Sequence, residues 1–285
     1  MTHAPPAAAD PARLREVALD VARQAGALLS RFATRRADGE DLDVSSKTSA
    51  TDPVSDADRA AERLIADELL RRCPDDGLVA EEGEAPRRGV SGRRWVVDPL
   101  DGTVNFLYGI PMWCTSIACV DDDGTLAGAV YHPVADEVFH AARGQGAARD
   151  DVALRCTTVD GLDRTLVATG FSYEPPVRVD QGTDVADLLR HVRDLRRGGS
   201  AALDLAWVAA GRIDAYVEFG LQPWDWAAGR LLVTEAGGRV TAVSRRLGGR
   251  ELDGVVAGGP AAHDHLVAWL HGRPAPAGAP TAGPR

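Results

Sequence analysis

The feature that most constrains this chain is the stretch Trp95–Phe106, which reads Trp-Val-Val-Asp-Pro-Leu-Asp-Gly-Thr-Val-Asn-Phe. Its first three residues form an apolar run typical of a buried strand. We expect this strand to end at Pro99, because proline has no N–H to donate to a central ladder. Asp98 and Asp101 would then lie together at the strand end, where two carboxylates are costly unless a cation separates them. Mg²⁺ suits such a place because it prefers oxygen ligands. A plain turn is the alternative interpretation, since Asp, Pro and Gly are common turn residues.

Six of these residues resemble the signature of the inositol monophosphatase family, the Mg²⁺-dependent, lithium-sensitive sugar phosphatases, and of its bacterial members in particular: Asp98-Pro99-Leu100-Asp101-Gly102-Thr103. The similarity extends from about Ala12 to the last predicted helix. It implies the α+β fold of the sugar phosphatases, an α/β/α/β/α layered sandwich. The residue pattern by itself predicts mixed α and β structure, with an antiparallel sheet in the first half of the chain.

The composition narrows the function. A formal net charge of −10 at pH 7 argues against a nucleic-acid-binding surface, which is normally basic. No apolar run approaches the roughly 20 residues that a membrane helix needs, and the first ten residues lack the basic and apolar regions of a signal peptide. The four cysteines form no Cys-x-x-Cys pair and no zinc-like spacing. We therefore predict a cytoplasmic protein that binds neither nucleic acid nor membrane. The resemblance adds a small-molecule phosphate monoester as substrate and a homodimer as the assembly.

The chain is long enough to bury a large core. We predict a single catalytic domain over residues 11–273. Its N-terminal half, about 11–160, would carry the antiparallel sheet, and its C-terminal half would cover about 161–273. Residues 1–10 and 274–285 are rich in Ala, Pro and Gly and are expected to be disordered.

Several helices and one hairpin are predicted from local signals. The apolar runs 113–120 and 126–131 flank Asp121-Asp122-Asp123-Gly124, which predicts a β-hairpin. Helical spacing and capping signals predict the following helices: 11–36; one from Pro53 to about Cys73 with Asp52 as N-cap; 184–196; 201–210 with Ser200 as N-cap; and one from Trp224 to Ala236.

The resemblance implies two to three Mg²⁺ ions held by five residues: Glu81, Asp98, the backbone carbonyl of Leu100, Asp101 and Asp225. The first ion would be held by Glu81, Asp98 and Leu100 and would carry the attacking water. The second would be held by Asp98, Asp101 and Asp225, and a third would be shared through Glu81. Each acidic residue also has a simpler interpretation. Adjacent glutamates are typical of a solvated loop, and an aspartate at a helix start complements the helix dipole.

Catalytic roles are implied for four residues: Asp58, Thr103, Glu82 and Lys47. Thr103, hydrogen-bonded to Asp58, would orient the attacking water and accept its proton, which requires hydrogen-bond reach. Glu82 would support Glu81, and Lys47 would neutralise phosphate or anchor its loop. Asp58 is expected in the second turn of its helix, where an acid can equally well serve the helix dipole alone.

The same resemblance implies a substrate site made of Asp101, Gly102, Thr103, Gly199, Ser200, Ala201 and Glu218. Such a site suits a polyol, because hydroxyls donate to acidic oxygens. The favoured function is Mg²⁺-dependent hydrolysis of myo-inositol monophosphate to inositol and phosphate by metal-activated water. The first alternative is the same reaction on histidinol phosphate or another small phosphate monoester. The second is a non-catalytic regulatory partner that retains the fold, as some relatives bind the transcription machinery.

Overall fold

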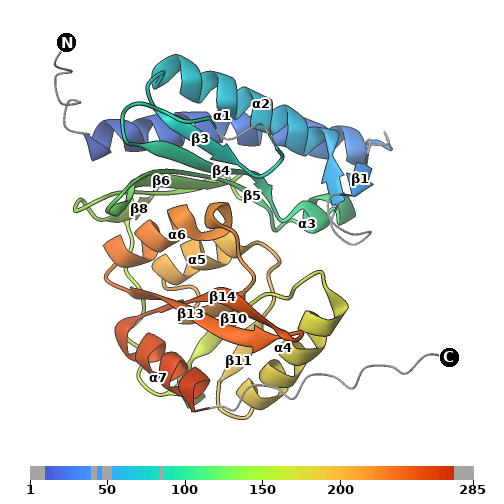
Figure 1. Ribbon diagram of the computed structural model, residues 1–285, viewed down its shortest axis with the longest axis vertical. Coiled ribbons are helices and arrows are strands. Elements are labelled where there is room, and N and C mark those ends of the chain that lie inside the picture. Colours follow the sequence, from blue (N-terminus) through green and yellow to red (C-terminus); the bar gives the residue numbers. More distant parts are fainter. Residues whose placement is uncertain (1–9, 40–43, 47–52, 84–86, 273–285) are drawn as a thin grey trace.

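The protein folds into five alternating layers of helices and sheets (Figure 1). The computed structural model describes residues 10–39, 44–46, 53–83 and 87–272, so residues 1–9 and 274–285 of the predicted disordered ends, and Lys47, lie outside the described residues. Asp10, which was predicted to be disordered, is the N-cap of the first helix. Helices α1 and α2 cover one face of a seven-stranded sheet, and α5 and α6 lie between that sheet and a five-stranded one. Helices α4 and α7 cover the outer face of the second sheet. The predicted α+β layered sandwich is confirmed.

The first sheet has the order β3-β4-β5-β6-β7-β8-β9. Strands β3 and β4 are parallel, and every later neighbouring pair is antiparallel. The predicted hairpin is confirmed as β5 and β6, with Asp121 paired to Gly124 at its end. The bounds are β3 Gly77–Ala80, β4 Arg94–Asp101, β5 Cys114–Asp121, β6 Gly124–His132, β7 Glu137–Ala142, β8 Ala147–Arg149 and β9 Val152–Ala153.

The second sheet has the order β11-β10-β12-β14-β13 and is mixed. Strand β10 is parallel to both β11 and β12, whereas β14 is antiparallel to β12 and β13. A two-stranded antiparallel pair, β1 and β2, lies apart from both sheets. The bounds are β1 Val44–Ser46, β2 Pro53–Ser55, β10 Leu166–Thr169, β11 Asp194–Arg196, β12 Ala215–Phe219, β13 Arg239–Leu247 and β14 Arg250–Gly258.

The helices begin at recognisable signals, with proline at the start of four of them. None of the described helices combines the length and apolar character needed to cross a membrane. The bounds are α1 Pro11–Ala37, α2 Asp56–Arg72, α3 Thr103–Tyr108, α4 Pro175–Leu188, α5 Ala201–Ala209, α6 Pro223–Glu235 and α7 Pro260–His271, with a 3₁₀ turn at Leu162–Arg164.

The middle layer holds the largest group of buried apolar side chains, drawn from α5, α6 and the facing sides of both sheets. Small residues let its helices approach closely. A Cβ on Gly128 of β6 would lie 3.2 Å from the Cβ of Ala228 in α6, and a Cβ on Gly229 would lie 2.5 Å from Leu205 in α5. Helix α6 is therefore held firmly against both neighbours, and this fixes the position of Asp225 in its first turn.

Two predicted helices are wrong in extent. Helix α2 does not start at Pro53, which belongs to β2; its N-cap is Ser55, and Asp58 lies in the first turn. Ser55 and Asp58 form a capping box, a stronger start signal than the Asp-Pro pair before it. The helix predicted at 184–196 starts earlier, at Pro175, and ends at Leu188. The last three predicted residues instead form β11, because they pair with the remote strand β10.

Candidate active site

The acidic signature lies where β4 meets α3 in the first sheet. The strand runs on through Pro99 to Asp101, so its predicted end at proline is wrong; its register with β5 shifts between Asp98 and Asp101. The N–H of Leu100 donates to Asp98 Oδ1 at 3.0 Å, which folds the backbone around that carboxylate. Gly102 then adopts a left-handed backbone with φ 96°, where a side chain would be strained. The chain thus turns directly from strand into helix.

Almost all predicted site residues line one cavity of about 1330 Å³. The exceptions are Asp58, which is fully buried, and Lys47, which lies outside the described residues. Residues from both halves of the chain meet here, although they come from five separate stretches of sequence. The predicted residues that line the cavity are Glu81, Glu82, Asp98, Leu100, Asp101, Gly102, Thr103, Gly199, Ser200, Ala201, Glu218 and Asp225.

Burial and neighbouring charges raise the pKa values of three aspartates in this cavity, Asp98, Asp101 and Asp225. Burial raises the pKa of Asp98 well above its usual range, and the nearby charges of Glu81 and Asp101 raise it further. Burial also raises the pKa of Asp225 well above its usual range, with the charge of Asp101 as the next cause. For Asp101 burial raises the pKa to about 6, although hydrogen bonds from Ser200 and a backbone N–H oppose the rise. Carboxylates in this state favour a proton or a cation as a partner.

The donors in the cavity fit a hard cation. They are carboxylate and carbonyl oxygens, with no sulfur or imidazole among the lining residues, and this is the set that Mg²⁺ prefers. Within the described residues, no three His, Cys, Asp or Glu side chains are already gathered as a coordination shell. The acidic groups share a cavity, and their charges act on one another.

Asp58 and Thr103 are in contact below the cavity. Thr103 Oγ1 lies 3.1 Å from Asp58 Oδ1 and also 3.1 Å from the carbonyl of Leu100. Because a hydroxyl carries one proton, it can donate to only one of these oxygens at a time. The other Asp58 oxygen accepts from the N–H of Ser55 at 2.8 Å as part of the capping box. Asp58 thus caps its helix and also accepts a hydrogen bond from Thr103, so its structural and catalytic interpretations are compatible.

Asp101 connects the two halves of the chain. Its Oδ2 accepts from Ser200 Oγ and from the N–H of Ala202, both at 2.7 Å. Ser200 is the N-cap of α5, as predicted, and accepts from the N–H of Leu203 at 3.3 Å. A helix N-terminus is suited to a carboxylate because its N–H groups have no partner within the helix. The Gly199–Ala201 segment is thereby fixed beside the signature.

Two residues that support the cavity were missed from the sequence. Glu62 of α2, which is 3% exposed, accepts from the N–H of Glu82 at 2.6 Å. Asn105 donates to the carbonyls of Met112 and Gly198 at 2.7 and 2.9 Å, which ties α3 to the loop before α5. Asn105 belongs to the signature stretch, and Glu62 is four residues after Asp58 on one helix face. These were the available signals, but neither identifies the partner.

A layered α+β fold with this acidic cavity defines a sugar-phosphatase-like class of protein. The model of the inositol monophosphatase family matches residues 10–273, and the chain belongs to this family. It is 45% identical over 274 residues to inositol-1-monophosphatase SuhB of Mycobacterium tuberculosis strain H37Rv, covering 92% of this chain and 94% of that one. It is 40% identical over 226 residues to Nus factor SuhB of Escherichia coli K12, covering 79% and 83%.

Solved structures agree with this assignment. The M. tuberculosis SuhB structure superposes with a TM-score of 0.76 at 42% identity and covers 92% of this chain and 97% of that one. The extragenic suppressor protein suhB of Bartonella henselae gives a TM-score of 0.82 at 38% identity, covering 91% and 99%. The family and the fold class predicted from the sequence are therefore confirmed.

Proposed function

We propose that the protein hydrolyses myo-inositol monophosphate to inositol and phosphate with the aid of Mg²⁺. The observation that carries this proposal is the meeting of Glu81, Asp98, Asp101 and Asp225 in one cavity, where burial and mutual repulsion raise the pKa of the three aspartates. Phosphate monoester hydrolysis is among the slowest uncatalysed reactions, so its catalysis requires strong charge stabilisation. A cavity that favours cations suits an anionic substrate, because the bound cations reverse the sign of its local charge.

The family resemblance implies two ion positions. Glu81, Asp98 and the carbonyl of Leu100 would hold one ion, and Asp98, Asp101 and Asp225 would hold another. Bound Mg²⁺ supplies Lewis acidity, which lowers the pKa of water and stabilises charge on the phosphoryl group. Glu82 would support this arrangement through its backbone contact with Glu62, which orders the chain next to Glu81.

The Thr103–Asp58 pair would handle the proton of the attacking water. The water oxygen forms a bond to phosphorus while the bond between phosphorus and the ester oxygen breaks. The water proton would pass to Thr103 Oγ1 while the hydroxyl proton moves to Asp58 Oδ1, 3.1 Å away. The leaving inositol oxygen would take a proton from solvent and Asp58 would return the proton it received, so the sum is one water consumed. Because Asp58 is fully buried, bulk water cannot compete with Thr103 for hydrogen bonds to its carboxylate.

The polyol would bind on the side of the cavity formed by the C-terminal half. Glu218 and the segment Gly199–Ala201 line that side and offer carboxylate and backbone groups. Asp101 faces both regions, because it belongs to the signature and is bound to the start of α5. Ring hydroxyls can donate to the acidic oxygens and accept from the backbone N–H groups.

A phosphate-release assay tests the proposal. The panel would contain inositol 1-phosphate, histidinol phosphate and glycerol 2-phosphate, each with Mg²⁺ and with EDTA. We expect Mg²⁺-dependent release that is fastest from inositol 1-phosphate, and a loss of at least about 10²-fold in kcat for Asp98→Asn, because an oriented charge is removed. A large preference for histidinol phosphate would favour the first alternative substrate.

Relatives named Nus factor SuhB favour a second candidate, a regulatory partner that needs no catalysis. The two candidates separate in Asp98→Asn: a biological effect that persists without phosphate release would support regulation and contradict catalysis as the role. The homodimer, the cytoplasmic location and the number of two to three ions stay predictions of the family resemblance.

A further inference from the structure

The carboxylate of Glu218 is held from one side by a buried tyrosine. Tyr216 and Glu218 are two residues apart on β12, so their side chains point to the same face of the sheet. The hydroxyl of Tyr216 donates to Glu218 Oε2 at 2.7 Å. Tyr216 is 0% exposed and packs in the middle layer with residues of α5 and α6. The tyrosine therefore reaches the cavity only through Glu218.

The backbone of a glycine lies close to the same carboxylate on another side. Gly170 directly follows β10, whose Thr169 is paired with Val217 of β12. A Cβ on Gly170 would lie 2.1 Å from both carboxylate oxygens of Glu218. Any other residue at position 170 would push the carboxylate away, so the close approach requires glycine. Glu218 is thus confined between a hydroxyl and a bare stretch of backbone.

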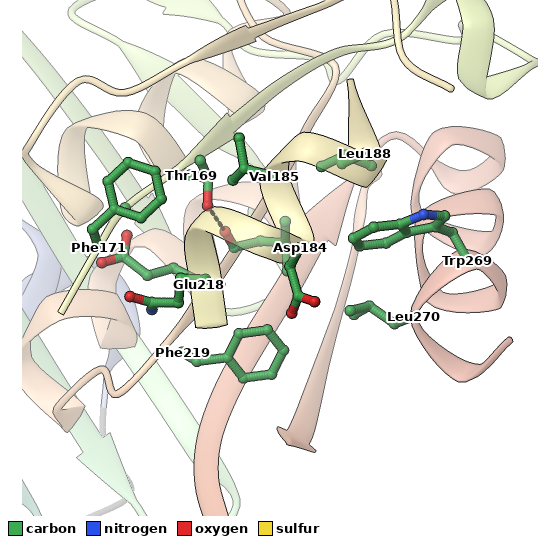
Figure 2. Close-up of a pocket in the computed structure, with 12 residues that line it drawn as sticks. Thr169, Phe171, Asp184, Val185, Leu188, Glu218, Phe219, Trp269 and Leu270 are labelled. Atoms are coloured by element: carbon green, nitrogen blue, oxygen red, sulfur yellow. Dashed lines mark hydrogen bonds between the residues drawn. The ribbon is translucent and has the colours of Figure 1, made fainter. Parts of the chain in front are cut away.

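Glu218 borders two cavities of very different size. The smaller one lies near α4 and α7 and is shown in Figure 2 with Phe219, Trp269 and Leu270. It has a volume of about 30 Å³ and a mostly apolar lining. On the other side, Glu218 and Gly170 both line the cavity of about 1330 Å³ that contains the acidic signature.

We infer that Tyr216 is a positioning residue that fixes Glu218 as an acceptor for substrate hydroxyls. It would thereby set the preference for polyol phosphates over phosphate esters that lack hydroxyls. This inference rests on the proposed function and adds a residue that does not touch the substrate. The physical reason is that a carboxylate bonded to a rigid, buried donor keeps one orientation, and directed hydrogen bonds need such an orientation.

The test is Tyr216→Phe, which removes one hydroxyl and keeps the ring in the core. We expect KM for inositol 1-phosphate to rise about 3- to 10-fold, an effect of the size of one ordinary hydrogen bond, with kcat little changed. KM for phenyl phosphate, which has no hydroxyl to offer Glu218, should stay the same. Glu218→Gln should show the same selectivity, and the double variant Tyr216→Phe/Glu218→Gln should add little to it.

Tyr131→Phe is a matched control, because Tyr131 also donates to a carboxylate, Asp136 Oδ1 at 2.9 Å, but lies on β6 away from the cavity lining. It should leave both KM values unchanged. Equal changes for the two substrates in Tyr216→Phe, or no change at all, would overturn the inference while the wild type still hydrolyses inositol 1-phosphate. A wild type with no preference for the polyol substrate would overturn the proposed substrate as well, so the two failures are distinguishable.

Discussion

At the scale of single residues, the cavity is organised by side chains that serve two purposes. Asp58 is the N3 residue of a capping box and also the acceptor for Thr103. Ser200 caps α5 and donates to Asp101. A residue that stabilises its own helix is held in place before any ligand arrives, so its second contact is preorganised. These double contacts explain how buried carboxylates keep one side-chain orientation beside a large cavity.

Thr103 is the residue whose loss separates chemistry from folding most clearly. Thr103→Val keeps the side-chain shape but removes the hydroxyl that would lie between the attacking water and Asp58 in the proposed reaction. We expect kcat for inositol 1-phosphate to fall about 10²- to 10⁴-fold, the usual contribution of general base catalysis, with a smaller change in KM. Thr165→Val is the control, since Thr165 is also buried and donates to the carbonyl of Gly161 at 2.9 Å. A kcat as high as that of the control would contradict the assigned role.

At the scale of secondary-structure elements, the position of α6 decides where Asp225 lies. The helix packs over β6 at Gly128 and Ala228, and Thr125 Oγ1 donates to the carbonyl of Ala227 at 3.0 Å. Such packing allows no added atom, because protein interiors are as dense as organic crystals. The start of α6, and with it the third acidic stretch of the site, is therefore set by strand β6 some hundred residues earlier.

Gly128→Ala tests this dependence. The new Cβ would lie 3.2 Å from Ala228, so α6 must shift or the neighbours must yield. We expect a loss of about 1–3 kcal/mol in the free energy of unfolding, the usual cost of overpacking, and a higher Mg²⁺ concentration for half-maximal activity. Gly182→Ala is the matched control: Gly182 lies inside α4 with nothing within 4 Å of its added Cβ. It should stabilise the protein by up to about 1 kcal/mol. Equal melting temperatures for Gly128→Ala and Gly182→Ala would contradict the prediction.

The sequence revealed elements whose signals are local and missed those set by remote pairing. The cap at Ser200 was predicted, and the start of α6 was predicted to within one residue, because capping and acidic helix-start signals lie within a few residues. The helix expected at 184–196 failed because its last residues pair with β10, which no local pattern records. The acidic residues were found from motifs, but the Asp101–Ser200 bond joins positions 99 residues apart and only the fold shows it.

At the scale of the whole molecule, the two halves of the chain meet at a cavity whose lining contains several carboxylates. Bonds from the start of α5 reach the signature strand, and Arg212 after α5 pairs with Glu137 of the first sheet. The carboxylates between them repel each other, and this repulsion opposes closure of the two halves. A bound divalent cation would relieve the repulsion, so folding stability should depend on metal and on pH together.

The raised pKa of Asp101 determines whether its contribution to folding stability increases or decreases with pH. Its pKa is raised from 3.8 to about 6 in the folded protein, so the folded state takes up a proton that the unfolded chain binds only near pH 4. In EDTA this group therefore stabilises the fold at low pH, and its contribution is lost as the pH rises through 6. His132 acts in the opposite direction, because burial lowers its pKa. The informative quantity is thus the difference in Tm between wild type and Asp101→Asn, whose amide stays neutral.

We expect that difference, measured in EDTA, to move in favour of the wild type as the pH falls from 7.5 to 5. Saturating Mg²⁺ should raise the wild-type Tm by several degrees at pH 7.5, since 100-fold excess over Kd adds about 2.7 kcal/mol. The gain should shrink towards pH 5, where protons compete for the same oxygens, and should be smaller in Asp101→Asn at every pH. A wild-type minus variant difference that does not change with pH would mean that the pKa of Asp101 is not raised in the folded protein, and the expected link between pH and metal binding would then be wrong.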